Sequence, residues 1–328
     1  MTQSIRIGIV GYGNLGRGVE TAIAKNSDMT LIGVFTRRDP DSVETLSATT
    51  PVFSMSQLSE FQDTVDVMIL CGGSKDDLPQ QTPELAKMFN TVDSFDTHAR
   101  IPEFYAAVDA QASAHQTTAL ISAGWDPGMF SINRLFGEAL LPDGETYTFW
   151  GKGLSQGHSD AVRRVEGVKA GVQYTIPSPE AIEQVRSGSR PSLTTRQKHT
   201  RECFVVLKEG ASQEQVEQTI KSMPDYFADY DTTVNFIDEV TLAKEHNAMP
   251  HGGFVIRSGN TSDAHTQVIE YSLQLNDNPG FTSSVLVAYA RAVYRLNQQG
   301  QYGAKTVFDV APGLLSPKTP EQLRKELL

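Results

Sequence analysis

The stretch that decides the fold is IRIGIV at residues 5–10, which runs directly into GYGNLG at residues 11–16. Apolar residues then recur at helical spacing through residue 23, so a strand, a glycine-rich turn and a helix follow one another. In a Rossmann unit the first glycine permits the tight turn, the second lets the backbone approach a pyrophosphate, and the third lets the helix pack on its strand. The sequence therefore predicts a dinucleotide-binding turn formed by Gly11, Tyr12, Gly13, Asn14, Leu15 and Gly16.

The end of the second predicted strand, Phe35-Thr36-Arg37-Arg38, distinguishes between the two nicotinamide cofactors. An acidic side chain there would accept from the ribose 2′-OH of NAD, whereas arginine accommodates the 2′-phosphate of NADP. We therefore expect NADP(H), bound through Thr36, Arg37 and Arg38. The alternative is a solvated basic turn in which Asp39 contacts the ribose of NAD.

Length and composition limit the class of protein. The chain has 328 residues, of which 39% are hydrophobic, and a formal net charge of −11. This length suggests about two domains, and the acidic balance disfavours a nucleic-acid partner. No stretch approaches the roughly 20 apolar residues that span a bilayer, and the N-terminus lacks the apolar segment of a signal peptide, so we expect a cytoplasmic protein without a membrane partner. Cys71 and Cys203 lie far apart in apolar runs, which favours reduced thiols over a disulfide or a metal site.

The first third of the chain alternates strand-like and helix-like segments. Residues 66–71 have the pattern of a buried parallel strand that ends in Gly72-Gly73-Ser74, and a helix and further strands follow. This alternation predicts a Rossmann-type, doubly wound parallel sheet with helices on both faces. Ligands collect at the carboxyl ends of such strands, so we expect Cys71, Gly72 and Ser74 to line the cofactor.

After residue 124 the pattern changes to longer β-rich runs: 145–150, 198–207, 230–237, 252–258 and 266–275. They predict a mixed sheet in a second, α+β domain. A helix over residues 281–298 is expected to return to the first domain and make it discontinuous. The expected division is residues 1–124 plus about 278–328 for dinucleotide binding, and about 125–277 for substrate binding and dimerisation.

Two aspartates follow predicted strand ends and are the candidate catalytic acids. Asp96 follows the strand at residues 91–93, and Asp126 lies in the turn Trp125-Asp126-Pro127-Gly128. Carboxylates at successive strand exits can face one cationic group, although Asp126 could instead order its proline turn. Trp150 could form a pocket wall with Trp125, although a large aromatic residue in a strand more often belongs to the core.

Segments spread over essentially the whole chain carry a family resemblance. They include GYGNLGRGVE, FTRR, TVDSFDTH, WDPGMFSINR, LSQGHSDA, QYTIP and MPHGG. Together they resemble the meso-diaminopimelate D-dehydrogenase family, and WDPGMFSINR followed by LSQGHSDA is not typical of dehydrogenases in general. The resemblance implies reversible, NADP-dependent oxidative deamination of the D-centre of meso-2,6-diaminopimelate. The products would be ammonia and L-2-amino-6-oxopimelate, which cyclises to tetrahydrodipicolinate on the route to lysine and cell-wall precursors.

The resemblance also implies roles for individual residues. Around the reacting D-amino centre it places Asp96, Trp125, Asp126 and Trp150, with Gln156 and Gly157 donating to the near carboxylate. At the distal L-centre it places Thr175, Arg201, His251 and Asn278. It further implies a homodimer or a larger homo-oligomer.

The residue types fit these roles but do not assign them alone. An arginine beside a strand is commonly a surface residue, Thr175 could be an ordinary strand threonine, and Asn278 before Pro279 could cap a helix. Two other functions stay open: a different NADP-dependent reductase of amino-acid metabolism, such as dihydrodipicolinate reductase, and a non-catalytic NADP sensor. The reductase would need no ammonium site, and the sensor would need no charged groups in the second domain.

Overall fold

The computed structural model describes residues 4–328. Its internal contacts divide the chain into two compact units, one of residues 1–132 and 279–328 and the other of residues 133–278. The division falls within helix α4 (Met129–Leu140) and at the start of helix α10 (Asn278–Gln298). The first unit is therefore built from two separate stretches of sequence.

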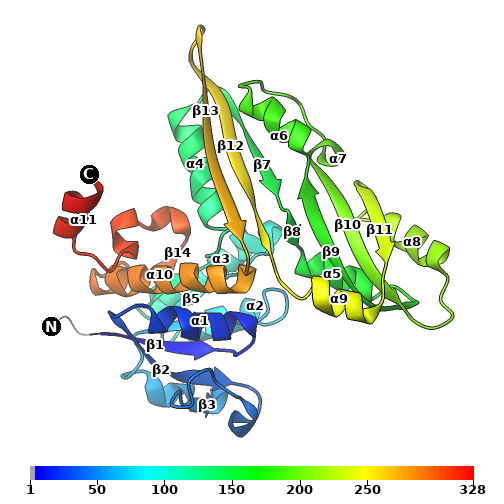
Figure 1. Ribbon diagram of the computed structural model, residues 1–328. Helices are drawn as coiled ribbons and strands as arrows, with labels where there is room; N and C mark the ends of the chain where they lie inside the picture. The colour runs from blue at the N-terminus through cyan, green and yellow to red at the C-terminus, as the bar shows by residue number, and fades with distance from the viewer. Residues whose placement is uncertain (1–3) are drawn as a thin grey trace. The chain divides into compact units, whose positions relative to one another are not determined.

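The first unit contains a seven-stranded sheet whose strands all run parallel (Figure 1). Its order is β14-β6-β5-β4-β1-β2-β3, so the chain winds outward from β1 in both directions. This arrangement confirms the predicted Rossmann-type sheet. The strands are β1 (Ile5–Val10), β2 (Met29–Thr36), β3 (Val52–Ser54), β4 (Val67–Leu70), β5 (Asn90–Asp93), β6 (Thr118–Leu120) and β14 (Gly303–Lys305).

Helices cover both faces of this sheet because successive side chains of each buried strand point to opposite sides. Ile5, Ile7 and Ile9 pack with residues of α1 (Asn14–Ala24) and α10 in one core. Val10 packs with residues of α2 (Leu78–Leu85) and α3 (Ile101–Ala114) in the other. Figure 1 shows α10 running beside α1, and the Ser283 hydroxyl of α10 donates to the Leu15 carbonyl at 2.9 Å.

The second unit contains the predicted mixed sheet and, in addition, a second sheet that the sequence did not predict. A four-stranded sheet, β11-β10-β9-β8, is mixed because β10 pairs parallel with β11 and antiparallel with β9. A three-stranded sheet, β13-β12-β7, is antiparallel throughout. The strands are β7 (Gly144–Trp150), β8 (Gly153–Leu154), β9 (Val168–Pro177), β10 (His199–Leu207), β11 (Asp231–Phe236), β12 (His251–Ser262) and β13 (His265–Leu275).

Short helices connect the strands of the second unit. They are α5 (Gln156–Arg163), α6 (Pro179–Arg186), α7 (Thr195–Lys198), α8 (Gln213–Lys221) and α9 (Glu239–Glu245). The Ser212 side chain caps α8 by accepting from the Gln215 N–H. The chain ends in α11 (Pro320–Leu327). Within residues 4–328, no helix combines the length and apolar character needed to cross a membrane.

Candidate active site

The glycine-rich turn has the geometry that a dinucleotide requires. Gly11 has a φ of +89°, which a residue with a side chain rarely adopts. A Cβ at Gly16 would lie 2.4 Å from the Gly11 carbonyl oxygen, so only glycine lets α1 start so close to β1. A Cβ at Gly13 would meet no atom within 4 Å, which leaves the approach to the N-terminus of α1 open.

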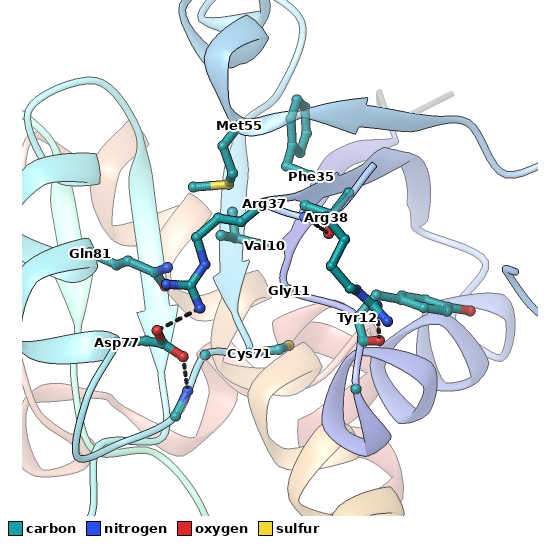
Figure 2. A pocket seen from close by; sticks show the side chains of 14 residues that line it. Val10, Gly11, Tyr12, Phe35, Arg37, Arg38, Met55, Cys71, Asp77 and Gln81 are labelled. Carbon is teal, nitrogen blue, oxygen red and sulfur yellow. Dashed lines mark hydrogen bonds and ion pairs between the residues drawn. The ribbon is translucent and has the colours of Figure 1, made fainter. Parts of the chain in front are cut away.

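A cavity of about 290 Å³ lies beside this turn at the carboxyl ends of β1, β2 and β4 (Figure 2). Of the predicted cofactor ligands, it is lined by Gly11, Tyr12, Gly13, Thr36, Arg37, Arg38, Cys71 and Gly72. The lining also includes Gly73 of the predicted turn, and five residues that sequence reasoning did not assign to it, which are Val10, Phe35, Met55, Asp77 and Gln81. Asn14, Leu15 and Gly16 belong to the first turn of α1 rather than to the lining, and the Ser74 hydroxyl accepts from the Asp96 N–H at 2.9 Å.

The two arginines are held by different partners. Arg38 donates from Nη2 to the Tyr12 carbonyl at 2.9 Å, and its N–H donates to the Thr36 hydroxyl at 3.1 Å. Arg37 pairs through Nη2 with Asp77 Oδ1 at 2.7 Å, as Figure 2 shows, and Gly73 N–H donates to the other oxygen of Asp77 at 2.8 Å. With two guanidinium groups and one carboxylate in its lining, the cavity is suited to an anion.

Asp39, the alternative ribose ligand, has a local role instead. Its carboxylate accepts from the Asp41 N–H at 3.1 Å and caps the short helix Pro40–Ser42. It is not among the residues that line the cavity. This arrangement favours the reading in which arginines, and not an acid, face the adenosine end of the cofactor.

One buried carboxylate ties together the loops that carry the two candidate acids. Asp93, at the end of β5, accepts from the Phe95 and Ser122 N–H groups, both at 3.0 Å, and from the Thr82 hydroxyl at 2.8 Å. Burial raises the pKa of Asp93 to about 6, although its three hydrogen bonds act in the opposite direction. Asp93 thus fixes the backbone before Asp96 and before Asp126.

The candidate acids themselves lie on these loops. Asp96 is exposed, and its N–H is held by Ser74. Asp126 is half-buried in a turn that a bridge between Trp125 and Gly128 closes. Trp125 is buried and packs edge-on against Phe130, with ring centroids 5.2 Å apart.

In the second unit, the candidate distal ligands share one row of the four-stranded sheet. Thr175 of β9 pairs with Gly153 of β8 on one side and with Arg201 of β10 on the other, and Arg201 pairs with Thr232 of β11. Directly paired residues project to the same face, so the Arg201 guanidinium reaches the Thr175 hydroxyl and donates to it. Arg201 is only 7% exposed, and burial lowers its pKa.

His251 and Asn278 belong to the same neighbourhood of the second unit. A Cβ at Gly153 would lie 2.4 Å from the His251 ring, so the glycine leaves the space that the ring occupies over the row. Asn278 N–H donates to the Met249 carbonyl at 3.0 Å, and the Leu154 N–H donates to the Pro250 carbonyl at 2.9 Å. The structure therefore brings the row containing Thr175 and Arg201 together with the segment that carries His251, and it ties Asn278 to that segment.

Trp150 lies over a histidine that sequence reasoning missed. The backbone N–H of Trp150 donates to Nε2 of His199 at 2.8 Å, and the two rings stack with centroids 5.4 Å apart. Burial and the charge of Arg201 lower the pKa of His199 to about 3, which leaves the imidazole neutral. His199 stands two residues before Arg201 on β10 and thus on the same face of the sheet.

Gln156 and Gly157 are the first two residues of α5, whose cap is Ser155. The Ser155 hydroxyl accepts from the His158 N–H, and a Cβ at Gly157 would meet no atom within 4 Å. Amides in the first turn of a helix lack partners within the helix, so this turn offers donors to a carboxylate. Gln156 also contacts the Met249 sulfur through Nε2 at 3.0 Å.

The fold and these features define a two-unit, NADP-dependent oxidoreductase. Residues 124–277 match the family model of the diaminopimelic acid dehydrogenase C-terminal domain. A meso-diaminopimelate D-dehydrogenase of Ureibacillus thermosphaericus is 63% identical over 326 residues, which are 99% of this chain and 100% of the relative. The chain belongs to the meso-diaminopimelate D-dehydrogenase family, which confirms the resemblance seen in the sequence.

Two solved structures support the same conclusion. A meso-DAPDH mutant of Clostridium tetani E88 with DAP is 56% identical, with a TM-score of 0.94, and the match covers 99% of this chain and 100% of that one. An engineered D-amino acid dehydrogenase bound to NADP+ is 48% identical, with a TM-score of 0.86 and the same coverage.

Proposed function

We propose that this protein catalyses the NADP-dependent oxidative deamination of the D-centre of meso-2,6-diaminopimelate. The products are L-2-amino-6-oxopimelate, which cyclises to tetrahydrodipicolinate, and ammonia. The observation that carries this proposal is the buried Arg201 guanidinium, which among residues 4–328 has no carboxylate partner. Such a group requires an anionic ligand, and the second carboxylate of diaminopimelate supplies one.

The cofactor is NADP(H), and the residues around the turn fit it. The open approach to α1 at Gly13 suits the pyrophosphate, while Thr36, Arg37 and Arg38 suit the 2′-phosphate. Cys71, Gly72 and Ser74 follow β4 at the same edge of the sheet. When bound, NADP+ supplies the oxidising group that takes up the hydride equivalent from the D-carbon.

At the reacting end, Asp96 and Asp126 are assigned to the substrate ammonium. One of them accepts its proton, directly or through water, because only the free amine can donate its electron pair as the C–H bond breaks. Their negative charge also stabilises the cationic iminium that develops on the substrate. Water then adds to the iminium carbon, and cleavage of the C–N bond releases ammonia and leaves the 6-oxo group. Trp125 and Trp150 are assigned to the walls of this site, and the amides of Gln156 and Gly157 to the near carboxylate.

At the distal end, Arg201 is assigned to the second carboxylate, with Thr175 and His251 as additional hydrogen-bond partners and Asn278 beside them. A guanidinium can bind a carboxylate through two parallel hydrogen bonds. The buried position of Arg201 supports this role, because a charge-assisted bond is stronger away from water.

Ammonia dependence tests the reaction type. In the reductive direction, oxidation of NADPH by the purified protein with L-2-amino-6-oxopimelate should require ammonium and should rise with its concentration until saturation. A reductase of a preformed cyclic imine would oxidise NADPH at the same rate without added ammonium. NADPH oxidation that ignores ammonium would therefore contradict the proposal.

We also propose a cytoplasmic enzyme of lysine and cell-wall precursor biosynthesis that forms a homodimer or a larger homo-oligomer. Three apolar side chains of α4 support self-association, since Leu135, Phe136 and Leu140 are between 45% and 67% exposed in the single chain. Sedimentation equilibrium tests this point. A monomer at micromolar concentration would contradict it.

A further inference from the structure

The environment of Arg201 is unusual for a buried cation. Its Cζ atom lies 3.9 Å from the centroid of the Tyr230 ring, and Nη1 donates to the Thr175 hydroxyl. Its Nε atom is buried without a hydrogen-bond partner in residues 4–328, and the same holds for the hydroxyl of Thr232 in the same row of the sheet. Thus the groups that hold Arg201 are all uncharged.

An aromatic ring is well suited to hold a guanidinium without neutralising it. The face of the ring carries partial negative charge, which attracts the cation across the flat side of the guanidinium group. Such a contact leaves the charge of the guanidinium uncancelled, and it does not take up all of its N–H donors. A carboxylate in the place of the ring would instead take up these donors and cancel the charge that a substrate carboxylate needs.

The backbone explains why the ring lies there. Tyr230 immediately precedes β11, and its N–H donates to the Phe227 carbonyl at 2.9 Å. It stands two residues before Thr232, which pairs with Arg201 in the parallel ladder of β10 and β11. From the bend before β11, the Tyr230 ring reaches the Arg201 side chain, which projects from the neighbouring strand beside Thr232.

We propose that Tyr230 is a positioning residue that sets the specificity of this protein for a substrate with a second carboxylate. Its ring fixes the Arg201 guanidinium against Thr175 and keeps its charge available to the far end of an amino dicarboxylate. This inference rests on the proposed function, because the ligand of Arg201 is the distal carboxylate of that substrate.

A double-mutant cycle tests the proposal. Tyr230→Leu should raise KM for meso-diaminopimelate about ten- to thirtyfold with a smaller change in kcat, the range for a desolvated cation–π contact. In the Arg201→Met background the same change should have almost no further effect on kcat/KM, because the group that Tyr230 positions is gone. Tyr230→Phe keeps the ring and should stay within about threefold of the wild type. If turnover of Arg201→Met is too slow to measure, the dissociation constant of meso-diaminopimelate replaces kcat/KM in the cycle.

Phe254 provides a matched control in the same unit. The Arg186 guanidinium lies over the Phe254 ring at 5.0 Å, so Phe254→Leu also removes a ring from an arginine, one that is paired with Glu270. The effects of Phe254→Leu and Arg201→Met on kcat/KM should simply multiply, because the two arginines are independent. If the effect of Tyr230→Leu on kcat/KM also multiplied with that of Arg201→Met, the inference would be overturned and the proposed function would be left intact. An Arg201→Met protein with wild-type kcat/KM would instead overturn the assigned role of Arg201 itself.

Discussion

At the level of single residues, Arg37 and Arg38 are the proposed determinants of cofactor choice. Replacing both with alanine should weaken NADPH binding far more than NADH binding, because only NADPH has the 2′-phosphate that they are assigned to bind. Each charged hydrogen bond contributes roughly 1.5–3 kcal/mol, or about ten- to a hundredfold in affinity. Fluorescence titration of both cofactors measures the difference. Equal weakening of the two would show that the arginines do not bind the phosphate.

The second prediction about a single residue concerns Arg201 and the distal carboxylate of the substrate. Arg201→Met should lower kcat/KM for meso-diaminopimelate by about two or more orders of magnitude, since it leaves a substrate carboxylate without its charged partner. Small D-amino acids, which lack that carboxylate, should lose much less. Steady-state kinetics with both kinds of substrate separates the outcomes. A similar loss for both would indicate that Arg201 has a structural role.

The sequence predicted single residues where the signal is local. FTRR indicated a phosphate-binding pair, and both arginines line the observed cavity. Asp77, the ion-pair partner of Arg37, was missed because it belongs to a distant segment of the chain. Tyr230 and His199 were missed for the same reason, since the pairing of β10 with its neighbours, rather than a local motif, sets their positions relative to Arg201 and Trp150.

At the scale of elements, the ends of β5 and β6 are held by the buried Asp93 carboxylate. Its folded-state pKa of about 6 is higher than the ordinary 3.8, so the folded state binds the proton more tightly. The stabilisation from that proton is fully present below the pKa that Asp93 has in the unfolded state. It is lost as the pH rises through the pKa that Asp93 has in the folded state. Between about pH 4 and pH 7 the wild type should therefore lose Tm relative to Asp93→Asn, so the Tm of the variant minus that of the wild type should increase.

Scanning calorimetry across this range measures that difference. Glu103→Gln, on the exposed side of α3, controls for the loss of one negative charge. Parallel Tm profiles for Asp93→Asn and the wild type would contradict the buried, proton-binding role of Asp93.

Local patterns predicted most elements but not how the strands of the second unit pair. The alternation in residues 5–122 indicated the parallel sheet, because buried parallel strands form continuous apolar runs between helices. In the second unit, β7 pairs with β12 across about a hundred residues of sequence, and no local pattern records such a partner. The two-residue strand β8 is too short to show a period at all. For these reasons the mixed sheet was predicted, but the second, antiparallel sheet was not.

At the scale of the whole molecule, the central claim is that two sets of charged groups select one stereoisomer. Both ends of diaminopimelate carry an amine and a carboxylate, so only their arrangement in space can distinguish the isomers. If Asp96 and Asp126 hold the ammonium and Gln156 and Gly157 hold the carboxylate, the hydrogen and the chain occupy the two remaining directions. An L-centre would exchange hydrogen and chain, and it would lose at least one charged contact.

The most direct test is NADP+ reduction with separated meso, LL and DD diaminopimelate. Unpaired buried charges cost several kcal/mol, so kcat/KM for the meso isomer should exceed that for the LL isomer by roughly a thousandfold or more. The DD isomer offers a correct reacting centre and a wrong distal one, and it should be an intermediate or poor substrate. Comparable kcat/KM for the meso and LL isomers would contradict the account, and with it the roles assigned to Asp96 and Asp126.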